Sequence, residues 1–122
     1  MIFIYRITIG GCRDFEDFEF FKTHLDTIIA QLNLDSDIII LSGHCRGTDF
    51  LAERYAVDNG FSLELFPAKW QQYGRSAGVI RNREMVLQSD LVIVFWDGKS
   101  KGTKNLINNT VELSKPLQII YL

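Results

Sequence analysis

The sequence predicts a single Rossmann-like, three-layer α/β/α domain over residues 1–122, with about five parallel strands between two layers of helices. Three observations predict this fold. Short apolar runs alternate with segments of helical periodicity along the whole chain, glycine-rich segments follow three of the runs, and neither an internal repeat nor a linker interrupts the pattern. Such alternation is typical of a parallel sheet with right-handed crossovers, for which we expect the strand order 3-2-1-4-5.

The first third of the chain predicts two strands and the helix between them. Tyr5–Gly10 is a β-branched run that leads into a glycine pair. From Asp14 to Leu32, apolar side chains recur at the spacing of one helix face, and Asp14 is the expected N-cap because its carboxylate can accept from the first turn. Ile38–Leu41 is apolar without alternation, which is typical of a strand covered on both faces.

The middle of the chain predicts a second helix, a third strand and a third helix. Thr48–Asn59 has helical spacing, with Phe50 among its inward side chains and Gly60 ending it. Phe61–Phe66 predicts a strand. A loop rich in aromatic residues and glycine then leads to a helix over Val79–Gln88.

The last third predicts a strand, a helix and a strand. Leu91–Trp96 is the most apolar run and therefore the expected central strand. Thr103–Leu113 has helical spacing and precedes Pro116, which cannot continue a helix. Leu117–Leu122 closes the expected sheet.

Composition limits the classes of function. The net charge of −2 and the pI of about 5.6 disfavour a function that requires binding along a long nucleic-acid backbone. The chain starts without the basic head of a secretory signal, and its apolar runs are too short to cross a bilayer. Cys12 and Cys45 form no ligand-spaced cluster, which fits a reducing compartment and disfavours a redox role. We therefore expect a cytoplasmic protein with no metal site and no membrane partner.

Three glycine-rich loops predict the functional edge of the sheet. Residues 10–14 (GGCRD), 42–49 (SGHCRGTD) and 97–103 (DGKSKGT) each lead from a strand into a helix. Glycine lets a ligand approach the backbone, and a helix N-terminus offers unpaired N–H groups to an anion. One such loop would be explained by turn geometry alone, whereas three at the carboxyl ends of the strands predict an anion site.

Basic residues gather in the same segments. Of the 13 Lys and Arg residues, those in or beside the loops or in residues 74–83 are Arg13, Arg46, Arg75, Arg81, Arg83, Lys99, Lys101 and Lys104. Arginine binds phosphate with a planar fork. The residues expected to bind the ligand are Gly10, Gly11, Arg13, Asp14, Ser42, Gly43, His44, Arg46, Gly47, Asp49, Arg75, Arg81, Asn82, Asp97, Gly98, Ser100, Gly102 and Thr103.

Carboxylates and aromatic residues of these segments leave alternatives open. Asp14, Asp49 and Asp97 could accept from ribose hydroxyls, hold Mg²⁺ together with a nucleotide, or cap helices. Trp70 and Tyr73 could stack on a base, whereas Trp96 is more simply a core residue.

The motifs GGCRD, SGHCRGTD, YGRSAGVIRNREM and FWDGKSKGT, in this order, resemble those of small single-domain members of the SLOG superfamily, in the branch related to YspA and YpsA. The resemblance spans roughly Ile7 to Leu122. It implies a Rossmann-like fold, binding of a nucleotide or nucleotide derivative at the glycine loops, and a homodimer or higher homo-oligomer, for which Phe15 and Phe20 are the expected exposed aromatic residues. The wider superfamily includes LOG-type phosphoribohydrolases, the DNA-processing protein DprA and sensor domains.

One departure from the LOG-type enzymes bears on catalysis. Those enzymes pair an arginine in an ERKxxM-like helix with a glutamate in a PGGxGTxxE motif. Arg81 matches the arginine, but Leu106 occupies the glutamate position, and leucine cannot stabilise an oxocarbenium-like state or activate water. Glu84, Asp97 and Asp49 are the carboxylates that could replace it.

Three functions remain, in a definite order. We expect first a nucleotide-binding or sensing module. The alternative is a phosphoribohydrolase that breaks the N-glycosidic bond of a nucleoside monophosphate, with Arg81, Glu84 and Asp97 as catalytic candidates. A DprA-like accessory of nucleic-acid processing comes third because the chain has no basic stripe.

Overall fold

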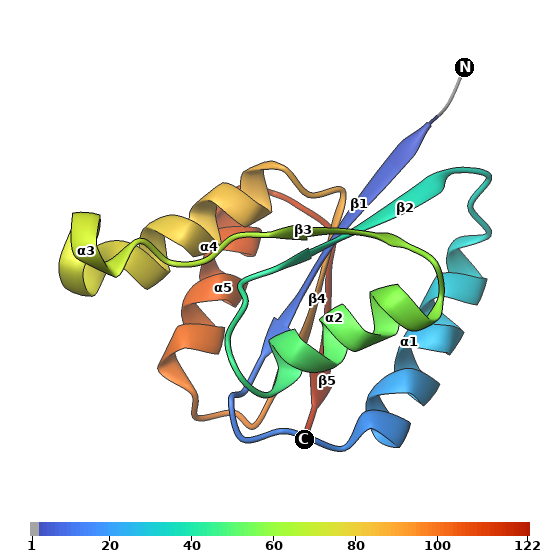
Figure 1. The fold of residues 1–122 in the computed structure, drawn as a ribbon, viewed down its shortest axis with the longest axis horizontal. Helices are drawn as coiled ribbons and strands as arrows, with labels where there is room; N and C mark the ends of the chain where they lie inside the picture. The colour runs from blue at the N-terminus through green and yellow to red at the C-terminus, as the bar shows by residue number, and fades with distance from the viewer. Residues whose placement is uncertain (1–2) are drawn as a thin grey trace.

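A computed structural model describes residues 3–122 and contains the expected sheet. Five parallel strands lie in the order β3-β2-β1-β4-β5 (Figure 1). The strands are β1 (Ile4–Gly11), β2 (Asp37–Ser42), β3 (Ser62–Leu65), β4 (Leu91–Trp96) and β5 (Leu117–Tyr121). The helices are α1 (Phe18–Leu32), α2 (Thr48–Asp58), α3 (Trp70–Tyr73), α4 (Ala77–Leu87) and α5 (Lys101–Glu112), with a 3₁₀ turn, η1 (Gly74–Ser76), before α4. Met1 and Ile2, the first residues of the segment expected not to be a secretory signal, lie outside the described residues.

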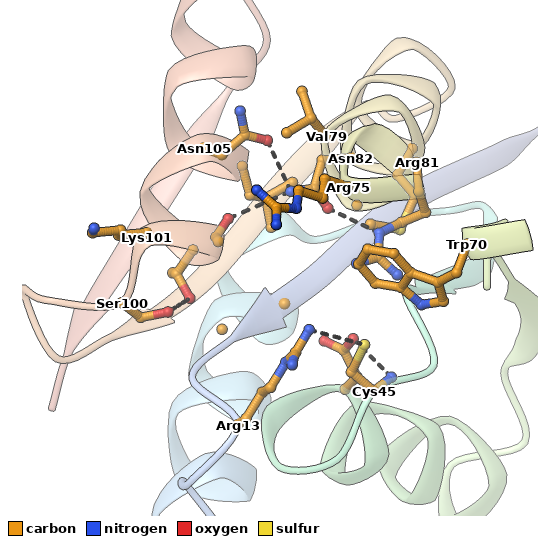
Figure 2. A pocket seen from close by; sticks show the side chains of 18 residues that line it. Arg13, Cys45, Trp70, Arg75, Val79, Arg81, Asn82, Ser100, Lys101 and Asn105 are labelled. Carbon is orange, nitrogen blue, oxygen red and sulfur yellow. Dashed lines mark hydrogen bonds between the residues drawn. The ribbon is translucent and has the colours of Figure 1, made fainter. Parts of the chain in front are cut away.

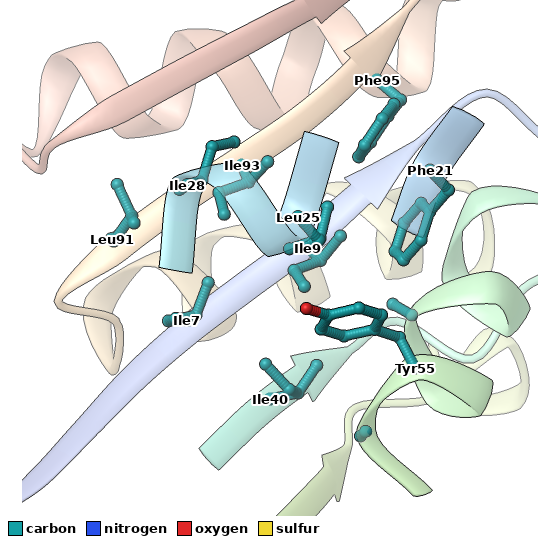
Figure 3. Close-up of a cluster of buried hydrophobic side chains, with 12 residues drawn as sticks. Ile7, Ile9, Phe21, Leu25, Ile28, Ile40, Tyr55, Leu91, Ile93 and Phe95 are labelled. Carbon is teal, nitrogen blue, oxygen red and sulfur yellow. The ribbon is translucent and has the colours of Figure 1, made fainter. Parts of the chain in front are cut away.

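The helices cover both faces of the sheet and form two cores. Helices α1 and α2 pack on one face, where Ile9 of β1, Phe21 of α1 and Tyr55 of α2 are buried (Figure 3). Helices α4 and α5 pack on the other face, where Met85 and Leu106 are buried against β4. The chain therefore changes face between β3 and β4. Since β1 and β4 are neighbours, their carboxyl ends form the topological switch point at which ligands bind in open α/β sheets.

The N-cap of helix α1 lies three residues after the expected one. Asp17, not Asp14, is the N-cap, and its Oδ1 accepts from the Phe20 N–H at 3.1 Å. Asp14 instead accepts from Arg46 Nη1 at 2.7 Å. The prediction of Asp14 as the cap was wrong because a basic side chain from the next loop competes for its carboxylate.

Helices α4 and α5 each begin two residues before the predicted start, at Ala77 and Lys101. The loop before α4 also contains the short helix α3 and the turn η1, which the sequence pattern did not indicate. Figure 1 shows α3 projecting outward beside the start of α4. All four residues of α3 are exposed, so no core periodicity could have revealed it.

Three aromatic side chains differ from their expected placement. Phe50, predicted to face inward, is 47% exposed and packs edge-on against His44, with ring centroids 5.4 Å apart. Phe15 and Phe20, expected to be exposed, are half-buried against the first core, and Phe15 stacks on Phe95 at 5.4 Å. These two residues are therefore less exposed than expected of an oligomer interface.

Two glycines with positive φ provide a test of the loop that follows β2. Gly47 has φ +80°, and a Cβ there would collide with the carbonyl oxygens of Arg13 and Cys12. Gly60 has φ +70°, but a Cβ there would meet open space. We predict that Gly47→Ala lowers the free energy of unfolding by at least about 3 kcal/mol, and Gly60→Ala by only about 1 kcal/mol. Urea unfolding monitored by circular dichroism measures both, and equal losses would contradict the close approach at Gly47.

Candidate functional site

A cleft of about 500 Å³ opens at the carboxyl edge of the sheet, at the switch point between β1 and β4 (Figure 2). Its walls come from the end of β1, the loop between β2 and α2, the α3–α4 segment and the first turns of α5. The expected ligand-binding residues that line it are Gly10, Gly11, Arg13, Asp49, Arg75, Arg81, Asn82, Ser100, Gly102 and Thr103.

Glycines keep the floor of the cleft open. A Cβ on Gly10 would lie 2.8 Å from Leu106 Cδ2, and a Cβ on Gly43 would lie 2.7 Å from Arg81 Nη1 and 2.9 Å from Asp49 Oδ2. Any side chain at these positions would displace the groups that face the cleft. The need for glycine here is therefore close approach between β1, β2 and the helices, which the sequence alone did not distinguish from turn geometry.

Arg81 of α4 is a buried cation that links three elements. Its side chain is 9% exposed, and Nη1 donates to the Gly43 carbonyl at 2.6 Å and to the Phe66 carbonyl at 3.3 Å. Its Nε donates to Asn82 Oδ1 at 3.0 Å. Because these bonds fix the guanidinium before any ligand arrives, Arg81 is pre-organised toward the cleft.

Amide side chains connect Arg81 to α5. Asn82 Nδ2 donates to Asn105 Oδ1 at 3.0 Å, and Asn109 Nδ2 donates to the same oxygen at 3.1 Å. Asn105 lines the cleft but was not among the expected residues. The only signal that could have indicated it is its place one helical turn after Lys101, on the α5 face that meets α4.

Asp49, at the start of α2, is the single carboxylate among the described residues that line the cleft. It is 8% exposed, and its Oδ2 accepts from the Cys45 N–H at 3.1 Å. Burial raises the pKa of Asp49 to about 6, although the Cys45 N–H and the charges of Arg81 and Arg13 act in the opposite direction. The carboxyl thus titrates near neutral pH, which is common at functional sites.

The first turn of α5 presents backbone N–H groups to the cleft. This helix has no side-chain cap at its N-terminus, and its residues Lys101, Gly102 and Thr103 line the cleft. Asp97 shapes the preceding loop, since its Oδ1 accepts from the N–H groups of Lys99 and Ser100 at 2.8 Å each. These hydrogen bonds lower the pKa of Asp97, and its side chain does not line the cleft.

Cations and one tryptophan surround the opening. Arg13, Arg75, Arg81 and Lys101 all line the cleft, and Figure 2 shows the first three side chains at the opening, whereas the Lys101 side chain extends away from them. Trp70 of α3 is 52% exposed and lines the cleft, close to Gly78. The other aromatic candidates lie elsewhere. Tyr73 does not line the cleft, and the Trp96 indole packs beside the second core while its N–H donates to the Ser100 carbonyl at 3.2 Å.

Ion pairing separates the arginines of the chain into two groups. Those outside the cleft pair with carboxylates: Arg6 with Glu64, Arg46 with Asp14, Arg54 with Asp58, and Arg83 with Glu112. Within residues 3–122, Arg13, Arg75 and Arg81 have no carboxylate oxygen within 4.0 Å, and neither does Lys101. The arginines that line the cleft are therefore those without a carboxylate in direct contact, whereas every arginine described outside it has one.

Several expected residues do not line the cleft. These are Asp14, Ser42, Gly43, His44, Arg46, Gly47, Asp97 and Gly98. Ser42 and His44 contact Glu53 instead, at 2.8 and 3.0 Å, and Glu84 is exposed on α4. The residues that line the cleft beyond those expected are Cys45, Trp70, Gly78, Val79, Met85, Lys101, Asn105 and Leu106.

The two cysteines are free thiols in different surroundings. Cys12 is buried, its pKa is raised mainly by that burial, and its Sγ accepts from the Asp97 N–H at 3.3 Å. Cys45 lies in the cleft with its Sγ 4.0 Å from Arg13 Nη2.

The described residues hold no group of three or more His, Cys, Asp or Glu side chains suited to sharing a metal ion. Asp49 is the one carboxylate that the cleft could offer to Mg²⁺, so the expectation of a nucleotide-borne Mg²⁺ stays a prediction. Among residues 3–122, every helix is too short or too polar to cross a membrane.

Comparison with known proteins confirms the resemblance expected from the motifs. A family model described as "YspA, cpYpsA-related SLOG family" matches residues 5–73, which include the first two glycine loops. The Gene 61 protein of Mycobacterium phage D29 is 31% identical over 119 residues, an alignment that covers 92% of this chain and 93% of the phage protein. No solved structure matches the chain significantly.

The raised pKa of Asp49 predicts a measurable effect on stability. This pKa is about 3.8 in the unfolded chain and about 6 in the folded one, so the folded state loses stability as the pH rises through this range. Replacing Asp49 by Asn removes the cost of a buried charge. We predict that Asp49→Asn is about 2–3 kcal/mol more stable than the wild type at about pH 7.5 and nearly equal to it at about pH 4.

Urea unfolding at both pH values measures the effect. Asp14→Asn is the matched control because this carboxylate is exposed on the surface. A wild type more stable than Asp49→Asn near neutral pH would contradict the account of Asp49 as an unrelieved buried charge.

Proposed function

Because the chain belongs to the YspA, cpYpsA-related SLOG family, we propose that it binds a phosphate-bearing nucleotide or nucleotide derivative in the cleft at the switch point. In this proposal the protein is a binding or sensing module. The observation that carries it is the division of the arginines. Arg13, Arg75 and Arg81 line the cleft without a carboxylate partner among the described residues, whereas the arginines outside it are paired.

The arrangement suits a small anion. The exposed side chain of Arg75 lines the cleft, and the first turn of α5, which begins at the exposed Lys101, adds backbone N–H groups to its wall. The chain as a whole has a net charge of −2, so this positive charge is local. A compact phosphate fits such a distribution better than a long polyanion does.

The size and the walls of the cleft favour a nucleotide over inorganic phosphate. About 500 Å³ is the volume of a small-molecule site, and Trp70 presents an aromatic face beside it. Leu106, Met85 and Val79 supply apolar wall. A ligand that combines phosphate with a flat ring would use both kinds of surface.

We predict that Arg75→Ala and Lys101→Ala each weaken nucleotide binding by at least about tenfold, because each removes a charge-assisted hydrogen bond to phosphate. Isothermal titration with a panel of nucleotides at fixed ionic strength measures the affinities. Arg83→Ala is the matched control, since this arginine is exposed on α4 and its Nη1 lies 3.6 Å from Glu112 Oε1. Binding that survives in the Arg75→Ala, Lys101→Ala double variant, or that falls equally in Arg83→Ala, would place the ligand elsewhere.

One observation favours a second function, hydrolysis of the N-glycosidic bond of a nucleoside monophosphate. Leu106 occupies the position of the glutamate of LOG-type enzymes, but a Cβ on Gly10 would lie 2.8 Å from Leu106 Cδ2 and 3.7 Å from Asp49 Oδ1. The carboxylate of Asp49 therefore borders the same part of the floor. A carboxylate there is the kind of group that hydrolysis requires.

We expect a nucleotide that binds to be recovered unchanged, since a phosphoribohydrolase needs a carboxylate aimed at the anomeric carbon and Leu106 occupies the position of the glutamate of LOG-type enzymes. Reversed-phase chromatography after prolonged incubation with nucleoside monophosphates separates free base from nucleotide. Release of base by the wild type, lost in Asp49→Asn and retained in Asp14→Asn, would make the protein an enzyme instead.

A further inference from the structure

Two buried, oppositely charged side chains on the floor of the cleft each keep a polar atom unused. Asp49 uses Oδ2 to accept from Cys45, and no hydrogen bond reaches its Oδ1 from residues 3–122. Arg81 uses Nε and Nη1, and its Nη2 has no acceptor in the same part of the chain. Every fully buried side-chain nitrogen or oxygen of the described residues has a partner, so Oδ1 and Nη2 are not fully buried, and both residues line the cleft.

The two side chains both lie close to Gly43 without forming an ion pair. A Cβ on Gly43 would lie 2.9 Å from Asp49 Oδ2 and 2.7 Å from Arg81 Nη1. No contact within 4.0 Å joins the carboxylate to the guanidinium among the described ion pairs. A ligand with neighbouring groups that can each donate and accept could therefore satisfy both side chains.

A hydroxyl group has this property, and a phosphate does not. The carboxylate of Asp49 repels a phosphate oxygen, and the cleft already provides Arg75, Lys101 and the first turn of α5 for phosphate. A hydroxyl donates to a carboxylate oxygen and accepts from a guanidinium. Carboxylates at the ligand edge of Rossmann-type sheets commonly accept from ribose hydroxyls.

On the basis of the function proposed above, we propose that Asp49 and Arg81 form a ribose-reading pair that selects ribonucleotides over 2′-deoxyribonucleotides. Oδ1 of Asp49 accepts from the 2′-hydroxyl, and Nη2 of Arg81 donates to the neighbouring 3′-hydroxyl. A ligand that lacks the 2′-hydroxyl leaves at least one buried charged group unpaired, and sites built to bind a hydroxyl reject analogues without it strongly.

The charges and hydrogen bonds around Asp49 and Arg81 support this proposal. Arg81 and Arg13 stabilise the carboxylate form of Asp49, which near neutral pH is an acceptor on both oxygens, while Glu53 of the same helix opposes it. The bonds of Arg81 to Gly43, Phe66 and Asn82 hold the guanidinium in place. The pair is therefore rigid enough to discriminate between ligands that differ by one oxygen atom.

The test compares the common ribonucleoside 5′-diphosphates with their 2′-deoxy counterparts by isothermal titration near neutral pH. The wild type should bind a ribonucleotide at least about tenfold more tightly than the deoxy form with the same base. Asp49→Asn should weaken the ribonucleotide and leave the deoxy form unchanged, so that the ratio approaches one. Asp14→Asn, with a carboxylate outside the cleft, should keep the wild-type ratio.

The outcomes separate this proposal from the function on which it rests. A wild-type ratio near one, with binding that still depends on Arg75 and Lys101, would overturn the ribose-reading pair and leave the phosphate site intact. A preference for the ribonucleotide that persists in Asp49→Asn would also overturn it. Failure of every nucleotide to bind would overturn the proposed function itself.

Discussion

Arg81 donates hydrogen bonds to the carbonyl oxygens of Gly43 and Phe66, the residues that follow β2 and β3, from a side chain that is 9% exposed. A buried charge is costly unless hydrogen bonds or an opposite charge compensate it. Here two carbonyls and the Asn82 amide provide hydrogen bonds, but no carboxylate of the described chain neutralises the guanidinium by contact. The walls of the cleft depend on this interaction, because it joins α4 to the ends of two strands and leaves positive charge facing the opening.

The cleft also contains a buried group of the opposite charge, the carboxyl of Asp49. Burial raises the pKa of this carboxyl to about 6, even though Arg81 and Arg13 lie near enough to lower it. A donor and an acceptor that lack hydrogen-bond partners on the floor of the cleft lower the free energy of unfolding of the ligand-free protein. Proteins retain such groups mainly where a ligand completes their hydrogen bonds. Phosphate at the cations and a hydroxyl at the floor would relieve both groups at once.

The sequence predicted the fold well because the fold depends on alternation. The strand order and both layers follow from apolar runs separated by helical periods, and these signals survive errors of a few residues at element ends. The site was predicted less completely. The glycine loops indicated the correct edge, but the pattern could not show that Arg46 turns to Asp14 while Arg13 lines the cleft, since both follow a cysteine in the same kind of glycine-rich loop. Asn105 and Leu106 were missed as lining residues because a helix interior carries no loop signal.

A ligand that lies between the first turn of α5 and the ends of β1 and β2 can be located by an NMR titration of the ¹⁵N-labelled protein. A ribonucleotide should shift the backbone amide signals of Lys101, Gly102 and Thr103, together with those of Gly10, Gly11 and the Nε–H of Arg81, while the amides of β5 remain unchanged. Shifts confined to β5 or to the outer face of α1, with the α5 signals unmoved, would contradict this location of the ligand.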